Sequence, residues 1–416
     1  MNRIHHLRWW IAGLLALATA LNYLDRQSLP VVIGELQKDI PISEVEYSQI
    51  QSLFLLSYAI MYAVGGKLMD WLGTRAGYAV MITWWSLANL LHGFADSVFS
   101  LKAYRFLLGL GEGGAFPGSA KAVSEWFPAS ERSFAFGIFN TGSSVGAVIA
   151  PPLIALIVSQ SDWRWVFFIT GALGIVWAAI WLWFYDLPSR HKKITIEEQK
   201  YIRDSLATGD KPGPGMSYWR LFKLRQVWGL LIAKFLTDSA WFFFIFWLPK
   251  YLADVRGLNI KEIGYYAWIP YAFAGAGSFI GGWLSSTLIR RNFSIDTSRK
   301  IALGLSAMLM PVSLGIIAAP LSIAIAFFST AMFAHQFWST IVQTLVADLF
   351  PSNTVGAVAG MIGCAGSFGA MLFNLLVGQM ITHFGSYGPV FTISGVMHPI
   401  GFMAILLVVR RIERIA

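Results

Sequence analysis

The sequence predicts an all-α membrane protein with twelve transmembrane helices in two six-helix bundles, with both termini in the cytoplasm. Of its 416 residues, 56% are apolar and only 13% are charged, whereas a soluble domain carries about 25% charged residues. The charges are also unevenly placed, since residues 301–347 and 349–409 contain no Asp, Glu, Lys or Arg. A helix needs about 20 apolar residues to cross a bilayer, so each of these stretches must fold as a helical hairpin. The lipid bilayer is therefore an expected partner.

The same criterion predicts the remaining spans in order along the chain. The first span is preceded by basic residues and contains Ala-rich sequence, so it resembles a signal peptide. We expect an uncleaved first helix instead, because eleven further spans follow it. The predicted spans cover residues 9–30, 47–68, 76–95, 101–124, 133–157, 165–185, 227–249, 263–288, 301–318, 321–346, 354–381 and 388–409.

The composition changes between the sixth and seventh spans. Residues 187–225 are rich in Lys and Arg and contain Gly213-Pro214-Gly215, which is typical of a polar linker. A short helix is expected within it over residues 194–206. The predicted domains are therefore an N-terminal bundle at residues 1–186, a cytoplasmic linker, and a C-terminal bundle at residues 226–416.

The positive charge predicts the orientation of the chain. Its net charge of +9 could suggest nucleic-acid binding, but basic residues gather in cytoplasmic loops of membrane proteins, so we expect no nucleic acid as a partner. With the N-terminus inside, most Lys and Arg residues fall on the cytoplasmic side. The opposite side holds Lys38, Lys102, Arg164, Lys250, Arg256 and Lys261.

A faint internal repeat relates the two predicted halves. Gly65-Gly66-Lys67-Leu68 ends the second span, and Gly281-Gly282-Trp283-Leu284 ends the eighth. Six plus six helices related by a parallel repeat is the layout of the major facilitator fold.

Few charged residues remain inside the predicted spans. A charge near the middle of a bilayer costs about 2.5–3.5 kcal/mol on the insertion scale, so these residues should face a cavity and neutralise one another. The alternative is that they form structural salt bridges between helices. The residues concerned are Asp25, Arg26, Arg105, Glu112, Lys234 and Asp238.

The spacing of these charges suggests proton-coupled transport of an anion. Arg105 and Glu112 are two helical turns apart and share a helix face, while Asp25 is next to Arg26 in sequence. Arg pairs bidentately with carboxylates, so Arg26 and Arg105 are candidate substrate clamps. An anion that takes these Arg partners would release Asp25 and Glu112 to bind protons. Lys234 and Asp238, at i and i+4, form either a coupling pair or a self-neutralising structural pair.

Several uncharged polar and aromatic side chains in the spans could contact substrate hydroxyl groups, although packing is an alternative role for each of them. These candidates are Tyr23, Tyr58, Trp241, His335, Gln336, Asn140 and Ser143.

Patterns typical of enzymes occur in the wrong context. Residues 109–114 match GxGxxG, but no strand precedes them. Residues 142–146 match GxSxG without a strand–turn–helix context. The sequence has no metal-ligand cluster or Walker loop, so we expect neither an enzyme nor a bound cofactor. The expected coupling ion is the proton. The single Cys364 does not indicate a redox compartment.

The residues also resemble a known family. Residues 66–75, Gly-Lys-Leu-Met-Asp-Trp-Leu-Gly-Thr-Arg, resemble the loop signature of the major facilitator superfamily. In that family the acid and the arginine form a cytoplasmic gate latch, a role that the resemblance gives to Asp70 and Arg75. Residues 22–26, residues 105–117 and residues 124–132 resemble the anion:cation symporter branch, which includes hexuronate and galactonate transporters.

This resemblance implies import of a sugar acid together with protons. Asp25 and Glu112 match the protonation sites of the galactonate-type members, and Arg26, Tyr23 and Tyr58 match their substrate contacts. The chain departs from the pattern at Ser143, which replaces a Gln, and at Gly363, which replaces an Asn.

The sequence thus predicts a proton symporter of a hexuronate such as glucuronate or galacturonate, working by alternating access. The alternative substrates are other organic acids: an aldonate such as galactonate, or a tartrate-like or phthalate-like acid. A non-transporting sensor or membrane enzyme is the alternative of a different class. We expect a multi-pass protein of the cell membrane, the inner membrane if bacterial, for which a monomer suffices.

Overall fold

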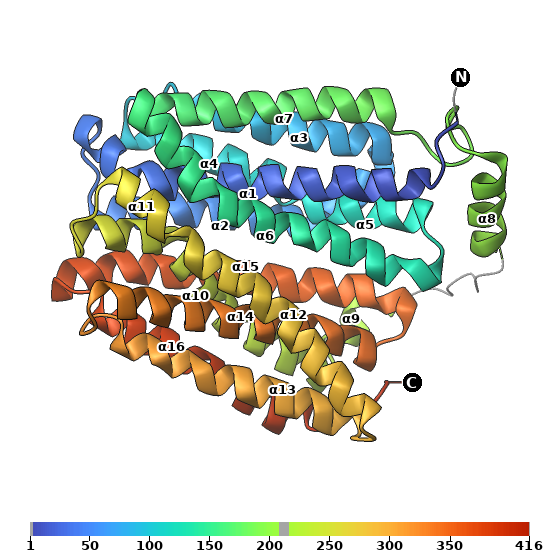
Figure 1. Ribbon diagram of the computed structural model, residues 1–416. Helices are drawn as coiled ribbons and strands as arrows, with labels where there is room; N and C mark the ends of the chain where they lie inside the picture. Colours follow the sequence, from blue (N-terminus) through green and yellow to red (C-terminus); the bar gives the residue numbers. More distant parts are fainter. Residues whose placement is uncertain (1–2, 208–215, 416) are drawn as a thin grey trace.

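The computed structural model describes residues 3–207 and 216–415, and within these ranges the chain is built from helices. One isolated β-bridge joins Ile4 to Ile194. The linker prediction at Gly213-Pro214-Gly215 lies outside the described residues. Figure 1 shows the long helices running roughly parallel or antiparallel to one another, with both termini at the same end of the molecule.

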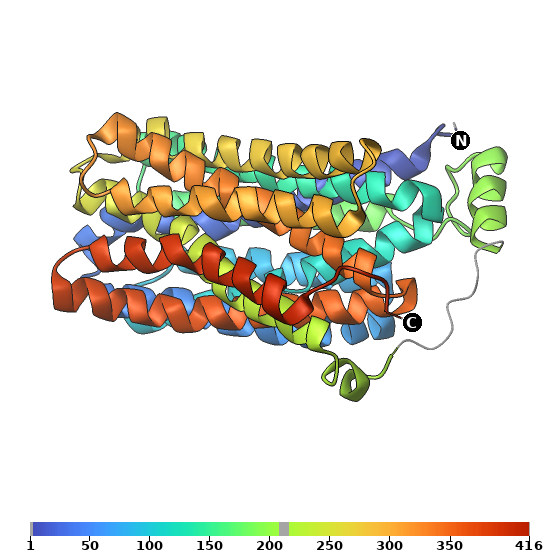
Figure 2. The ribbon, with the colours of Figure 1, turned by 90° about the horizontal axis from the view of Figure 1, so that it is seen from below.

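The helices form two groups, which lie one above the other in Figure 1; Figure 2 views the second group from below. The first group contains α1 (Leu7–Asp39), α2 (Glu44–Leu72), α3 (Thr74–His92), α4 (Val98–Glu112), α5 (Ala115–Trp126), α6 (Ala129–Gln160) and α7 (Arg164–Phe184). Between the groups lie α8 (Ile196–Ala207) and α9 (Tyr218–Leu221). The second group contains α10 (Arg225–Asp254), α11 (Ile260–Tyr266), α12 (Trp268–Arg290), α13 (Ile295–Leu309), the 3₁₀-helix η1 (Met310–Gly315), α14 (Leu321–Leu349), α15 (Ser352–Phe384), α16 (Gly388–Ala404) and the π-helical η2 (Ile405–Val409).

Nine helical segments among the described residues are long and apolar enough to cross a membrane. Three other predicted spans correspond to α3, to α4 with α5, and to α13 with η1, which are shorter, interrupted or more polar. The twelve-span count and the cytoplasmic location of the termini therefore stay predictions. The helix predicted in the linker is observed as α8.

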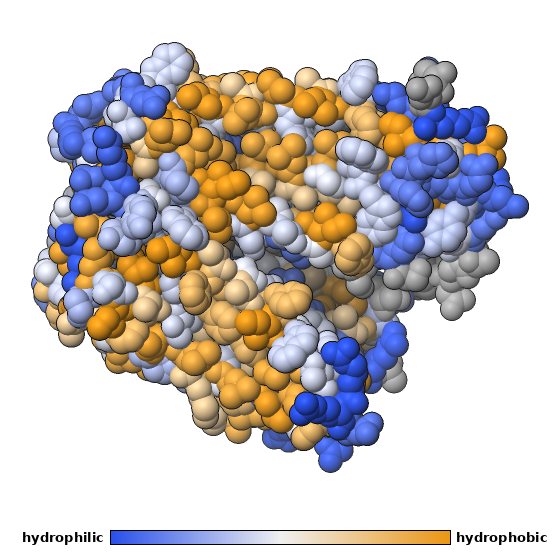
Figure 3. Space-filling view, in the orientation of Figure 1, coloured by the Kyte–Doolittle hydropathy of each residue, from blue (hydrophilic) through white to orange (hydrophobic). Residues whose placement is uncertain are grey.

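The surface of the long helices suits contact with lipid. Figure 3 shows hydrophobic residues over the middle of the molecule and hydrophilic ones at both ends of the helices. Large apolar side chains are exposed on many helices; examples are Leu17, Ile149, Leu173, Phe279, Met308 and Leu376. Exposed apolar surface of this extent marks a membrane-embedded protein rather than a soluble one.

Two glycines allow α1 and α6 to pack closely. A Cβ atom added at Gly142 would collide with the backbone of Ala16, and one at Gly146 would collide with Ala20. Small residues at such positions let membrane helices approach at backbone distance. The two glycines of the GxSxG pattern are thus packing residues on a helix.

Replacing Gly142 by alanine should destabilise the protein, because the added methyl group must push α6 away from α1. Overpacking of this kind costs about 1–3 kcal/mol. Gly137→Ala on the same helix is the matched control, since nothing lies within 4 Å of its added Cβ. Thermal unfolding in detergent should show a lower melting temperature for Gly142→Ala only. Equal melting temperatures of the two variants would contradict the close-packing account.

The two ends of the molecule differ in how the groups meet. We call the end with both termini the terminal end, and the end where α1 finishes at Asp39 the distal end. In the distal half, the Tyr47 hydroxyl donates to the Phe246 carbonyl (2.6 Å), and the Asn374 amide donates to the Ser48 carbonyl (2.9 Å). Among the described residues, the hydrogen bonds and ion pairs that join the two groups all lie in this half.

Lys250 provides the charged part of this distal closure. Its ammonium group lies 2.9 Å from Glu44 of the first group and also pairs with Asp254 on its own helix. The Lys250 side chain is only 1% exposed, while Glu44 retains 25%. Toward the terminal end, in contrast, Figure 3 shows the surface hollowed between the two groups. The structure is therefore closed distally and open toward the termini.

The linker helix α8 is attached to the first group by charges. Arg8 pairs with both Glu131 and Glu198 at 2.8 Å. The Glu198 carboxylate also accepts from the backbone N–H groups of Leu7 and Arg8, so it caps the start of α1. Figures 1 and 2 show α8 at the terminal end, beyond the long helices.

Candidate functional site

A buried ion pair joins α1 to α4 in the interior of the first group. The Arg26 Nε donates to Glu112 Oε2 at 2.9 Å, and a second guanidinium nitrogen lies 2.9 Å from the same oxygen. That second nitrogen also donates to the Asn22 side-chain oxygen at 2.9 Å. Both charged side chains are at most 3% exposed. The other carboxylate oxygen of Glu112 has no hydrogen-bond partner among the described residues.

Aromatic rings surround the Arg26 guanidinium. Its central carbon lies 4.7 Å from the ring centroid of Tyr23 and 4.9 Å from that of Tyr58, with Phe54 at 5.5 Å. Such contacts favour a cation at this position. We call Asn22, Tyr23, Arg26, Tyr58 and Glu112 the Arg26 cluster.

The other two charges of this group have different partners from those that the sequence suggested. Glu112 is paired with Arg26 rather than with Arg105 on its own helix. Arg105 is fully buried and donates instead to the backbone carbonyl of Arg26, at 3.1 Å. Arg105 therefore places its positive charge next to the backbone of Arg26 rather than against the Glu112 carboxylate.

Asp25 points away from Arg26 toward α3 and α7. It accepts a hydrogen bond from the Asn89 amide at 2.8 Å, and the same amide lies 2.6 Å from the Thr170 hydroxyl. Its second carboxylate oxygen is buried without a partner among the described residues. The adjacency of Asp25 and Arg26 in sequence therefore does not make them an ion pair, because successive residues on a helix point about 100° apart.

The second group carries its own buried ion pair on α10. Lys234 and Asp238 are 2.8 Å apart, with side chains 9% and 11% exposed. The other oxygen of Asp238 lies against Gly366 of α15, where a Cβ atom would collide with it. The helix α10 packs against α1, which carries Tyr23 and Arg26. The pair and the Arg26 cluster therefore lie on adjoining helices of the two groups.

Trp241 and His335 lie beside this pair. Their rings stack in parallel, with centroids 4.8 Å apart and planes 10° from each other. His335 also contacts His398 of α16 through a hydrogen bond of 3.1 Å between Nδ1 and Nε2. We call Lys234, Asp238, Trp241, His335 and His398 the His335 cluster.

The two remaining candidates on α6 lie on one face of that helix. Asn140 is exposed and Ser143 half-buried, and the Ser143 hydroxyl donates to the Asn140 carbonyl at 2.6 Å. Gly142 and Gly146 face α1, whereas Val145 is exposed on another side. By helical geometry, Asn140 and Ser143 lie on the side of α6 opposite Val145.

Gln336 is not brought together with His335. It lies one turn from Phe333, whose backbone meets Gly277 of α12, and one turn before Thr340, which hydrogen-bonds Ser278 of α12. Gln336 therefore lies on the side of α14 toward α12, and its side chain is half-buried.

His398 and Tyr62 are contacts of this region that the sequence reasoning did not single out. His398 is a histidine within an uncharged stretch, the same signal that identified His335. Tyr62 follows Tyr58 by one helical turn, and its ring lies 5.2 Å from that of Tyr58. A Cβ atom at Gly363 would lie 2.8 Å from the Tyr62 ring, so this aromatic ring covers the small residue at position 363.

Comparison with known proteins shows the family of this chain. The model of the Major Facilitator Superfamily matches residues 15–332. The chain belongs to the major facilitator superfamily. It is 36% identical to the hexuronate transporter of Escherichia coli (strain K12) over 420 residues, covering 99% of this chain and 96% of that protein. It is 38% identical to the galacturonate transporter of Dickeya chrysanthemi over 326 residues, covering 77% and 94%.

A solved structure supports the fold. The crystal structure of a D-xylose-proton symporter superposes with a TM-score of 0.75 at 16% identity, covering 97% of this chain and 98% of that one. This major facilitator protein is thus a multi-pass membrane protein of a transporter family.

The loop signature of this major facilitator protein has separate partners in the present conformation. Asp70 pairs with Lys121 at 2.7 Å. Arg75 donates to the Leu182 carbonyl at 2.6 Å and lies 3.8 Å from Asp186. Asp70 and Arg75 are therefore not paired with each other where the molecule is open toward the termini, and their latch role stays a prediction.

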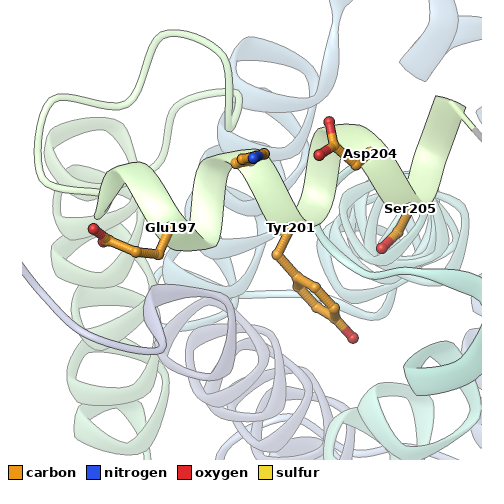
Figure 4. Close-up of a pocket in the computed structure, with 5 residues that line it drawn as sticks. Glu197, Tyr201, Asp204 and Ser205 are labelled. Atoms are coloured by element: carbon orange, nitrogen blue, oxygen red, sulfur yellow. The ribbon is translucent and has the colours of Figure 1, made fainter.

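A pocket on α8 lies apart from both clusters. Figure 4 shows Tyr201 pointing from α8 toward the neighbouring helices, while Glu197 and Asp204 point elsewhere. The Tyr201 hydroxyl donates to Glu131 at 3.1 Å, so this residue belongs to the attachment of α8. Across the described residues, no group of His, Cys, Asp and Glu side chains has the arrangement of a metal site.

Proposed function

We propose that this major facilitator protein imports a hexuronate such as glucuronate or galacturonate together with protons. The observation that carries the proposal is the buried Arg26–Glu112 pair, flanked by Tyr23 and Tyr58, with the buried Lys234–Asp238 pair on the adjoining helix α10. The names of the two relatives support a hexuronate as the substrate. Their bacterial origin supports the inner membrane of a bacterium as the location.

In the Arg26 cluster, a substrate carboxylate can replace Glu112 as the partner of Arg26. A substrate carboxylate would bind the planar guanidinium of Arg26 in place of Glu112. Glu112 would then be a buried carboxylate without a cation, and a proton neutralises it at the lowest cost. One proton entering with one monovalent anion leaves the charge of the site unchanged. Asp25, buried and bonded to an amide rather than to a cation, is a second place for a proton.

The two clusters lie on opposite groups of helices, as alternating access requires. The Arg26 cluster belongs to the first group, while Trp241 and His335 belong to the second. Rocking of one group against the other would expose the same site to either end in turn. Both groups belong to one chain, so a monomer suffices, and no cofactor takes part.

Uptake into proteoliposomes tests the coupling. The wild-type protein should accumulate glucuronate or galacturonate only when the outside is more acidic than the inside. Glu112→Gln keeps the shape of the side chain but removes the carboxylate, so it should bind and exchange substrate without accumulation. Glu197→Gln, an exposed carboxylate on α8, is the matched control and should behave as the wild type.

Two outcomes contradict this proposal. Accumulation that is indifferent to the pH gradient, or that is retained in Glu112→Gln, argues against proton coupling at this carboxylate. A binding panel of glucuronate, galacturonate, galactonate, tartrate and phthalate tests the substrate separately. Preference for one of the last three acids would replace the hexuronate by another organic acid.

A further inference from the structure

His398 is a fully buried side chain whose environment orients it toward His335. It lies on α16 and is 0% exposed. Its ring packs edge-on against Trp338, with centroids 5.6 Å apart and planes at 74°. Its Nε2 lies 3.1 Å from the Nδ1 of His335, and the Trp241 ring stacks on the His335 ring.

A hydrogen bond between two imidazole nitrogens needs one N–H and one lone pair. The direction of this bond is therefore linked to which nitrogen of His335 carries its proton. If His335 donates through Nδ1, its Nε2 has a lone pair and accepts from a hydroxyl group. If His335 accepts at Nδ1, its Nε2 carries the proton and donates to a carboxylate or hydroxyl oxygen. In both cases His398 sets the direction of the hydrogen bond that His335 can make.

Of the two ring nitrogens that the His335–His398 bond leaves unused, only Nε2 of His335 is accessible. His398 Nδ1 is fully buried and has no hydrogen-bond partner among the described residues. His335 Nε2 has no partner there either, but it is not one of the fully buried polar atoms, and His335 keeps about 2% of its surface accessible. The Nε2 edge of His335 thus contributes to this accessible area, next to Trp241 and the Lys234–Asp238 pair.

We propose that His398 is a positioning residue that holds the ring and the tautomer of His335 for a hydrogen bond to a hydroxyl or carboxylate group of the transported organic acid. This inference rests on the proposed function, since it assigns a binding role to the second group of helices. His398 itself is enclosed and does not touch the substrate.

Amide variants separate positioning from simple packing. Gln can place its terminal amide where His Nε2 lies, so His398→Gln keeps a group able to bond His335 Nδ1. His398→Leu fills similar space without any hydrogen-bonding group. We expect His398→Leu to weaken binding of the preferred acid about 3- to 10-fold, the loss of one hydrogen bond. His398→Gln should recover most of that affinity.

A double-variant comparison shows whether His398 acts through His335. His335→Gln can retain a group at the Nε2 position but loses the bond to His398. His335→Gln/His398→Leu should therefore bind no more weakly than His335→Gln alone. The idea is overturned if His398→Leu has wild-type affinity, if His398→Gln is as weak as His398→Leu, or if the two losses multiply in the double variant.

Nitrogen-15 spectra of labelled histidine provide a readout that does not depend on the substrate. His398→Leu should shift both ring-nitrogen signals of His335, because its hydrogen-bond partner and tautomer balance change. Unchanged His335 signals would overturn the positioning role. Failure of the proposed function is distinct from this, since the wild-type protein would then bind none of the hexuronates in the panel.

Discussion

Replacing Arg26 by alanine is expected to weaken binding of the transported acid by about 100-fold or more and to abolish its uptake. The Arg26 guanidinium is buried, is paired with the Glu112 carboxylate, and lies between the rings of Tyr23 and Tyr58. Truncating one member of a buried, hydrogen-bonded charge pair costs about 2–5 kcal/mol, and each 1.4 kcal/mol is about tenfold in affinity. Calorimetry or a thermal-shift titration with glucuronate and galacturonate measures this loss.

Two further variants separate loss of the anion contact from loss of the fold. Arg26→Lys keeps the charge without the planar fork, so it should bind measurably but more weakly than the wild type. Arg26→Ala/Glu112→Gln removes both charges, so it should recover the melting temperature of the unliganded protein without recovering binding. Affinity close to that of the wild type in Arg26→Ala would show that the acid binds elsewhere.

Replacing Lys250 by alanine should shift the protein toward a conformation that opens at the distal end. Lys250 lies between Glu44 and Asp254, and its removal leaves two carboxylates close together without a cation. Breaking a fully buried pair costs about 3–5 kcal/mol. Because Glu44 is 25% exposed and partly screened, we expect a smaller shift of about tenfold in the population of the distally open form.

Cysteine labelling measures this shift. In a Cys364→Ser background, the chain has no other cysteine, and Ser52→Cys places a thiol at a position that is 4% exposed in the distal closure. Lys250→Ala should raise the maleimide labelling rate of Ser52→Cys about tenfold. Lys261→Ala, which removes an exposed lysine at the same end, is the control. Equal labelling rates in the two variants would show that Lys250 does not hold the distal end closed.

The sequence alone limited the class of the protein, because hydropathy and charge report on the solvent around each segment. Long uncharged stretches require lipid, whatever the packing of the helices. The same argument identifies Asp25, Arg26, Arg105, Glu112, Lys234 and Asp238 as residues that must be sequestered, and all six are buried in the structure. Lys234 and Asp238 are four residues apart on one helix, so their contact follows from local geometry.

The partners of the other four charges depend on how the helices pack. Arg26 meets Glu112, 86 residues away, rather than the neighbouring Asp25, because of the rotation of α1 against α4. Close glycine contacts decide which faces of these helices meet their neighbours: Gly142 of α6 meets Ala16 of α1, and Gly109 of α4 meets Phe54 of α2. His398 likewise reaches His335 only because α16 lies against α14. Hydropathy is a property of each residue, whereas these contacts are properties of pairs of helix faces, and only the tertiary structure decides them.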